Sequence, residues 1–157
     1  MPVSRKLGYI GLGKQTAKGT GVAPSKFVRF QGDTTLTPAL AFTQHWEGGM
    51  GLDPGVALKE SQRYDASFTV FARPDTAGFL FAWALGVDAV SGVADPYTHV
   101  ITPHASDIPW LTVERYVQGL NLVERIIDCR IQQIEVTGES RQPIRLAVNI
   151  RGRTAEL

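Results

Sequence analysis

The clearest alternation of apolar and polar residues lies between positions 64 and 73. One side of this segment is apolar, with Tyr64, Ala66, Phe68, Val70 and Ala72, and the other is mostly polar, with Asp65, Ser67, Thr69 and Arg73. Phe71 is the exception on the polar side. A period of two is that of a β-strand. The segment therefore predicts a sheet with one face on a core and the other in water.

Shorter patterns of the same kind predict strands at 26–31, 34–41, 97–102, 110–117, 123–136 and 144–151. The long segment 123–136 changes register along its length. Ile127, Cys129 and Ile131 share one side, whereas Ile134 and Val136 share the opposite one. Such a change predicts a β-bulge, or a strand that passes from one environment into another.

One helix is predicted over 75–85. Pro74 precedes it, Asp75 or Thr76 can cap its first turn, and Gly86 stands where a helix terminator belongs. Phe79 and Trp83 form an apolar ridge beside the main apolar face. A helix that is apolar nearly all round needs cover on more than one side. We expect its own sheet on one side and lateral subunit contacts through Phe79 and Trp83 on the other.

With strands on both sides of one helix, the fold class is mainly β: a β-sandwich or barrel with one flanking α-helix. Residues 1–24 are expected to form an N-terminal arm, and residues 25–157 the β-sandwich domain. Glycine alternates with bulkier residues at 8–13, which weakens a strand that has no neighbour. The arm could order against another subunit, or it could be a flexible terminus.

Residues 42–60 are predicted to form a long loop without clear periodicity. Loops of this length are usually functional or disordered. Trp46, Met50 and Leu52 are of types enriched at the centres of protein interfaces, and Phe42 and His45 accompany them. The loop therefore predicts a partner surface, with a Trp46 that folds back onto the core as the alternative.

Composition and charge fit one soluble β domain and narrow its function. The chain has 157 residues, 43% of them hydrophobic, with 16 basic and 15 acidic residues and a formal net charge of +1. This charge gives no sign of a dedicated nucleic-acid binder and little protection against self-association. No apolar run follows Arg5 and Lys6, so no signal peptide is predicted. We expect neither a membrane anchor nor, with one cysteine, an intrachain disulfide.

Candidate chemistry is sparse. The pair Gly11 and Gly13 lacks the helix-opening glycine of a dinucleotide loop. His99 and His104 are five residues apart with Pro103 between them, which is poor spacing for a metal site. Cys129 is predicted to be buried and unreactive. We expect no catalytic residue, no metal and no cofactor.

Two segments carry a resemblance to a known family. Residues 8–20 (GYIGLGKQTAKGT), followed by 23–27 (APSKF), resemble the opening of the major tail tube proteins of siphophages, which have long non-contractile tails. Residues 109–115 (PWLTVER), followed by a glycine turn and residues 128–130 (DCR), are similar to a second stretch of that family. Both segments are structural and together span most of the chain.

The resemblance implies a β-sandwich whose copies join edge to edge into a ring around a lumen. The arm, with Tyr9 and Leu12, and the loop, with Phe42, His45, Trp46, Met50 and Leu52, would contact the next ring. Asp65, Ser67 and Thr69 would face the lumen. The implied partners are identical copies, the tape-measure protein and passing DNA, without a cofactor, in a virion tail assembled in the host cytoplasm.

Alternatives remain at this point. Some family members are about twice as long with two tube-like domains, so the ring could hold six single-domain copies or fewer two-domain ones. The subunit could also be a tail terminator, a distal adaptor or a secretion-tube ring protein. A carbohydrate- or peptide-binding module, using Trp46 and Trp110, is the alternative from another class.

Overall fold

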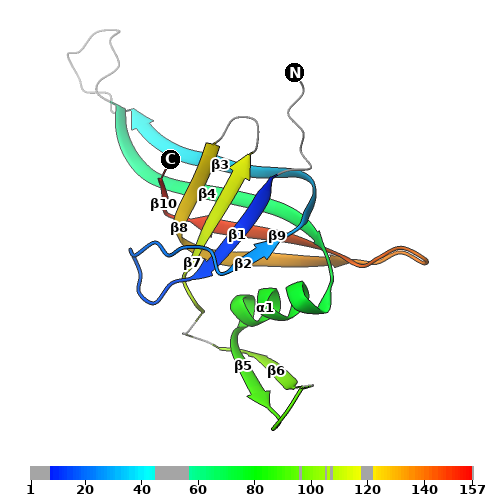
Figure 1. Cartoon of the computed structure of the whole chain (residues 1–157). Coiled ribbons are helices and arrows are strands. Elements are labelled where there is room, and N and C mark those ends of the chain that lie inside the picture. The colour runs from blue at the N-terminus through cyan, green and yellow to red at the C-terminus, as the bar shows by residue number, and fades with distance from the viewer. Residues whose placement is uncertain are drawn as a thin grey trace, which may run out of the picture.

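The computed structural model describes residues 8–44, 57–95, 97–104, 106, 108–117 and 122–156. Within these residues lie one helix and ten strands (Figure 1). They are β1 (Tyr9–Lys14), β2 (Lys26–Val28), β3 (Phe30–Gln44), β4 (Ala57–Phe71), α1 (Pro74–Leu85), β5 (Gly86–Ser91), β6 (Thr98–Pro103), β7 (Leu111–Val117), β8 (Leu122–Thr137), β9 (Arg145–Gly152) and β10 (Thr154–Glu156). The chain is therefore mainly β with one helix, as the sequence predicts.

Eight strands form one antiparallel sheet in the order β2-β1-β7-β8-β9-β4-β3, with β10 paired to β8. Its two outermost strands, β2 and β3, are separated in the chain by Arg29 alone. The sheet therefore curls into a nearly closed barrel, and α1 lies across one end of it (Figure 1). This agrees with the predicted barrel with a flanking helix.

β8 is the longest strand and contains the predicted change of register. Its pairing with β7 shifts between Leu111 and Val113, and its pairing with β9 shifts between Ile131 and Gln133. Asp128 has a φ of 56°, in the left-handed region that aspartate tolerates better than most residues. The bulges allow the four consecutive residues 126–129 to be buried, which a regular strand does not permit.

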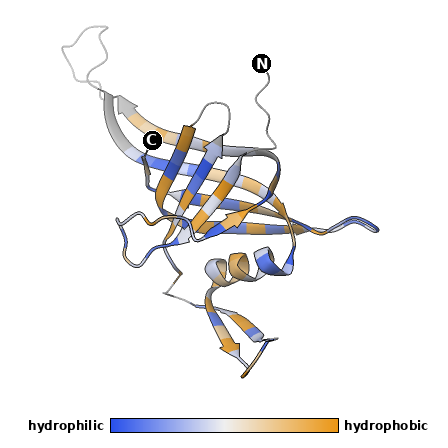
Figure 2. Ribbon diagram, viewed as in Figure 1, coloured by the Kyte–Doolittle hydropathy of each residue, from blue (hydrophilic) through white to orange (hydrophobic). Residues whose placement is uncertain are grey.

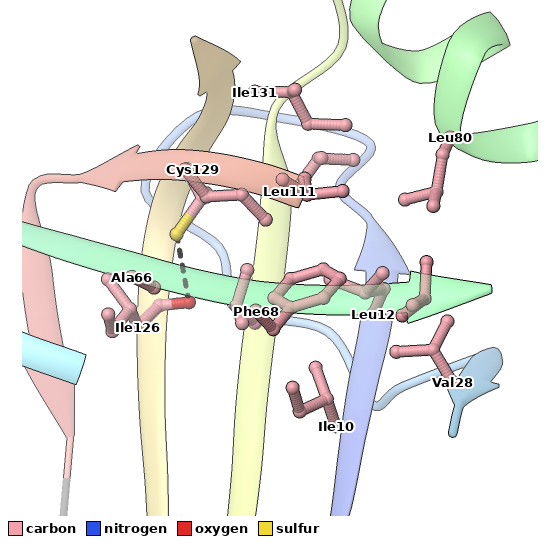
Figure 3. Close-up of a cluster of buried hydrophobic side chains, with 14 of the residues drawn as sticks. Ile10, Leu12, Val28, Ala66, Phe68, Leu80, Leu111, Ile126, Cys129 and Ile131 are labelled. Carbon is pink, nitrogen blue, oxygen red and sulfur yellow. Dashed lines mark hydrogen bonds between the residues drawn. The ribbon is translucent and has the colours of Figure 1, made fainter. Parts of the chain in front are cut away.

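The core fills the inside of the barrel and extends to the helix (Figure 3). Ala66, Phe68 and Val70 of β4 face inward, as the alternation at 64–73 predicts. They meet fully buried side chains from the other strands and from α1, namely Leu12, Leu80, Leu111, Ile126 and Leu146. Burial of this apolar surface stabilises the curved sheet.

The predicted helix is confirmed, with one correction at its start. Arg73 occupies the N-cap position without a side-chain cap, and Pro74 is the first helical residue. The expected cap by Asp75 or Thr76 is therefore wrong, because both lie inside the first turn. At the other end Gly86 has a φ of +104° and donates its N–H to the Ala82 carbonyl, which confirms the predicted terminator.

Two predicted boundaries change. Residues 9–14 of the expected arm form β1, which is paired on both edges with β2 and β7. The expected loop at 42–60 is shorter, since β3 continues to Gln44 and β4 begins at Ala57. Residues 45–56 lie outside the described ranges.

The segment 97–102 is a strand as predicted, but its partner β5 was not foreseen. β5 and β6 form a separate two-stranded hairpin that projects from the helix end of the molecule (Figure 1). Hydrophobic residues lie on both strands of this hairpin (Figure 2). Among its apolar residues, Val90, Val93, Tyr97 and Val100 are exposed. A lone hairpin is marginally stable in water, so its contacts with α1 help to hold it.

Candidate assembly surfaces

The outward face of β4 is polar and carries the three predicted lumen residues. Asp65 accepts a hydrogen bond from Arg151 Nε at 3.1 Å, and its other oxygen lies 3.2 Å from Arg63 Nε. Ser67 Oγ lies 2.7 Å from Thr35 Oγ1. The strand register places β9 residues Arg151, Asn149 and Ala147 opposite Asp65, Ser67 and Thr69. We call this surface, formed by the outward residues of β3, β4, β9 and the end of β8, the polar face.

The polar face is bounded by two open strand edges. Among the described strands, β3 pairs with β4 alone, and β8 beyond Cys129 pairs with β9 alone. The outer edge of β3 and the second edge of residues 133–137 therefore face no described strand. Unpaired N–H and C=O groups along an edge are a template for pairing with another chain.

The β3–β4 hairpin extends beyond the barrel (Figure 1), and Leu36, Leu40 and Phe42 of β3 alternate onto one side of it. Leu36 on this side still packs against the core, whereas Leu40 and Phe42 are 47% and 58% exposed. A contact with the next ring through Phe42 stays a prediction. The other predicted contact residues of this segment, His45, Trp46, Met50 and Leu52, fall in the part of the chain that the structure does not describe.

β1 belongs to the subunit's own sheet, which changes two predicted inter-ring contacts. Leu12 is fully buried in the core, so it has no surface left for a neighbouring ring. Tyr9 is half-buried, and its hydroxyl donates to Glu114 Oε1 at 2.7 Å. The hydrogen bond to this carboxylate, and then burial, raise the pKa of the Tyr9 phenol. We therefore remove Leu12 from the expected assembly contacts and assign Tyr9 first to contacts within the subunit.

An ionic strip that sequence reasoning did not predict lies beside Tyr9 and consists of Glu114, Arg115, Glu124 and Arg125. Glu114, 5% exposed, accepts from Tyr9 and from Arg125 Nη2 at 2.9 Å. Arg115 pairs with Glu124 and donates from Nη1 to the Thr34 carbonyl at 2.9 Å, which connects β7 to β3. A buried carboxylate needs such partners to remain charged. The strip therefore fixes β1, β7 and β8 in register and has a structural role.

Phe79 and Trp83 form the predicted ridge on α1, with ring centroids 5.0 Å apart. Both are partly buried and pack against the core cluster. Their inner sides therefore contact their own subunit. Their lateral contact with a neighbouring copy remains a prediction.

A pocket of about 530 Å³ opens where β1 ends, beside the end of α1. Its lining includes Lys14, Gln15, Trp110 and Arg130, and the Arg130 guanidinium carbon lies 3.9 Å from the centroid of the Trp110 ring. Lys18 Nζ lies 5.1 Å from the same ring. We call these five residues the cationic pocket. Sequence reasoning missed it, because the adjacency of Trp110 and Arg130 depends on the pairing of β7 with β8.

Groups able to do chemistry are few in the described ranges. Cys129 is fully buried, and burial raises the pKa of its thiol to about 12, so the reactive thiolate is disfavoured. His99 pairs with Asp88 on the exposed hairpin. Within the described residues no group of three or more His, Cys, Asp or Glu side chains could hold a metal ion. Nor does any described helix have the length and apolar character needed to cross a membrane.

No protein-family model matches the sequence, and no curated protein is similar to it in sequence. Solved structures that are similar in fold include two chains of one assembly. A chain of the six-fold symmetrised baseplate of the anti-feeding prophage matches with a TM-score of 0.62 and 14% identity, over 99% of this chain and 95% of that one. A chain of the tube-terminating cap of the same prophage matches with a TM-score of 0.57 and 7% identity, over 99% and 90%. The tail-tube-like fold is thereby confirmed, and the narrower assignment to siphophages stays a prediction.

Proposed function

We propose that this chain is a structural, non-enzymatic subunit that assembles into rings of a tail-like tube. The observation that carries the proposal is the four-stranded section β3-β4-β9-β8, which has a polar outward face and an open strand edge on each side. If the edge of β3 in one copy pairs with the far edge of β8 in the next, the sheets join into one continuous barrel. Closure of such a ring removes the exposed edges.

In such a ring the polar face lines the lumen. Asp65, balanced by Arg63 and Arg151, and the hydroxyls of Ser67 and Thr69 would face the channel. Each copy then contributes two guanidinium groups and one carboxylate from these residues, a small excess of positive charge that would contact the phosphates of passing DNA. This surface fits a tube that surrounds a tape-measure protein and later conducts DNA, in a virion tail assembled in the host cytoplasm.

Contacts between rings are assigned to the far end of the β3–β4 hairpin. Leu40 and Phe42 are exposed there although they are apolar, and segment 45–56 adds Trp46, Met50 and Leu52. Apolar residues on a projecting hairpin are typical of a partner surface. Phe79 and Trp83 of α1 are assigned to lateral contacts within a ring.

The test is direct imaging of the purified chain by negative-stain microscopy, with its mass measured by light scattering. We expect rings and stacked tubes, with six copies per ring as in the symmetrised baseplate. A monomer of constant mass at high concentration would contradict the proposal. Deletion of residues 40–60 is expected to leave a folded subunit that cannot stack.

A second candidate is a subunit of a single ring at one end of a tube. The two similar structures, a baseplate and a tube-terminating cap, favour this reading. The same images separate the two functions, because a cap or baseplate subunit forms single rings and a tube subunit forms long stacks.

A further inference from the structure

The cationic pocket gathers positive charge that no carboxylate of the described residues balances. Lys14, Lys18 and Arg130 line the pocket or lie over its tryptophan ring. The ion pairs found among the described residues involve other side chains. Asp128 precedes Arg130 closely in the sequence, but its Oδ1 accepts the Gly19 N–H at 2.6 Å. Positive charges held together without counter-charge favour an anionic partner.

Two residues of the pocket each have a buried side-chain atom with no hydrogen-bond partner in the described part of the chain. These atoms are Gln15 Oε1 and Arg130 Nε. Gln15 is 6% exposed and held in place, because its backbone N–H donates to the Trp110 carbonyl at 2.8 Å and its Nε2 donates to the Thr20 carbonyl at 2.9 Å. A buried donor or acceptor that stays unpaired destabilises the fold. Gln15 and Arg130 therefore offer an acceptor and a donor to a molecule that enters the pocket.

The strand register places the pocket next to the polar face. Arg130 lies opposite Arg151 of β9, and Arg151 Nε donates to Asp65 on the polar face. Side chains directly opposite each other on antiparallel strands lie on the same face of a sheet. The five residues of the cationic pocket belong to none of the surfaces assigned above to contacts between copies. A ring would therefore leave the pocket open to another molecule.

The shape and chemistry of the pocket favour a peptide over a nucleic acid. Its volume of about 530 Å³ lies within the range of about 300–1,000 Å³ that is usual for ligand pockets. A guanidinium group binds a carboxylate through two parallel hydrogen bonds, and an amide oxygen such as Gln15 Oε1 accepts a peptide N–H. A nucleic-acid strand is instead held by a row of phosphate contacts, for which three cations around one concave site are few.

We propose that the cationic pocket binds an acidic peptide segment of another protein. The carboxylate of an aspartate or glutamate in that segment pairs with Arg130 and Lys14, and a peptide N–H of the segment donates to Gln15 Oε1. Lys18 adds a third positive charge beside the Trp110 ring. This contact goes beyond the ring contacts of the proposed function, and it does not require a ring.

The experiment is a titration of the full chain, followed by calorimetry at low salt, with the peptide acetyl-Gly-Asp-Glu-Gly-amide. The uncharged peptide acetyl-Gly-Asn-Gln-Gly-amide is the matched ligand, and we expect it to bind at least about tenfold more weakly. Lys14→Gln and Arg130→Gln should each weaken binding of the acidic peptide by about tenfold, because each removes a charged donor. Lys26→Gln removes an exposed lysine of β2 outside the pocket, and this control should bind as the wild type does. Lys14 is also exposed, so its variant folds even if Arg130→Gln does not.

Each other outcome would overturn the inference. Equal affinity for the two peptides, or an equal loss in Lys26→Gln, would show that no site for a carboxylate exists at the pocket. Tighter binding of a short single-stranded oligothymidylate than of the acidic peptide would assign the pocket to nucleic acid. If Lys14→Gln prevents assembly that the wild type shows by light scattering, a second copy of this chain occupies the pocket. The proposed function is tested separately, because a monomer that binds the acidic peptide contradicts the ring alone, and rings that do not bind it contradict the pocket alone.

Discussion

The two parts of β8 lie in different surroundings. Residues 122–129 are paired with β7 on one edge and, in part, with β10 on the other, and 126–129 are buried. Residues 133–137 pair with β9 alone, and Val136 is 54% exposed. We call β1, β2, β7, β10 and the first part of β8 the closed half, and β3, β4, β9 and the rest of β8 the open half. One strand thus contributes to the core of the subunit and, in the proposed ring, to the contact with the next copy.

The largest expected effect on folding comes from Leu12→Ala in the closed half. Leu12 is fully buried, so its truncation should lower the free energy of unfolding by about 2–5 kcal/mol. Leu40→Ala, at an exposed position of the open half, should change it by less than about 0.5 kcal/mol. Urea denaturation at concentrations that keep the protein monomeric measures both. Equal losses would contradict the division into halves.

Trp83→Ala is expected to have the next largest effect. Trp83 is partly buried against the core, so the loss should be smaller than the ~3–5 kcal/mol of a fully buried aromatic residue. We also expect the variant to form no rings of subunits, because the exposed side of the Trp83 indole is assigned to the contact with a neighbouring copy. Sedimentation velocity measures assembly, with Leu80→Ala as the buried control. If the Trp83→Ala variant still forms rings, Trp83 contacts only the core of its own subunit.

Cys129 gives a pH-dependent effect in the closed half. Its thiol pKa is raised from 9.0 to about 12 by burial, so between these values the unfolded chain loses the proton and the folded chain keeps it. Cys129 is thus expected to lower stability progressively as pH rises above 9, by up to about 1.4 kcal/mol per pH unit. The difference between wild type and Cys129→Ala, measured by denaturation from pH 8 to 11, isolates this effect. A difference that is constant with pH would contradict it.

The strand β4, helix α1 and the bulge in β8 could be predicted because their signals are local. Alternation, a terminal glycine and a change of register are all visible within one segment. The position of β1 in the sheet could not be predicted, because its glycines are required by a contact with residues farther along the chain. A Cβ on Gly11 would lie 2.6 Å from Pro24 Cβ, and one on Gly13 would lie 2.8 Å from the Ala23 carbonyl oxygen. Because these glycines have no Cβ, residues 22–24 can cross closely over β1. From the sequence alone, the same glycines indicated only a strand of low stability.

Prediction of the candidate site from the sequence was limited in the same way. Asp65, Ser67 and Thr69 could be placed on a wet face from the period of β4 alone. The cationic pocket could not, because Trp110 and Arg130 are brought together by the β7–β8 register, in which Leu111 pairs with Cys129. The number of open edges also depends on the complete strand order, which no single segment reveals.

Val136→Lys is expected to have the smallest effect on folding and a large effect on assembly. Val136 is exposed near the end of β8, where the second edge of the strand faces no described strand. A surface change of this kind alters stability by less than about 0.5 kcal/mol. A lysine on a strand edge nevertheless opposes pairing with another chain, because its charge would lose water in the new sheet. Val93→Lys, at the fully exposed turn of the β5–β6 hairpin, is the matched control. Light scattering should show monomers for Val136→Lys and rings for Val93→Lys, and rings in both would exclude the far edge of β8 from the lateral interface.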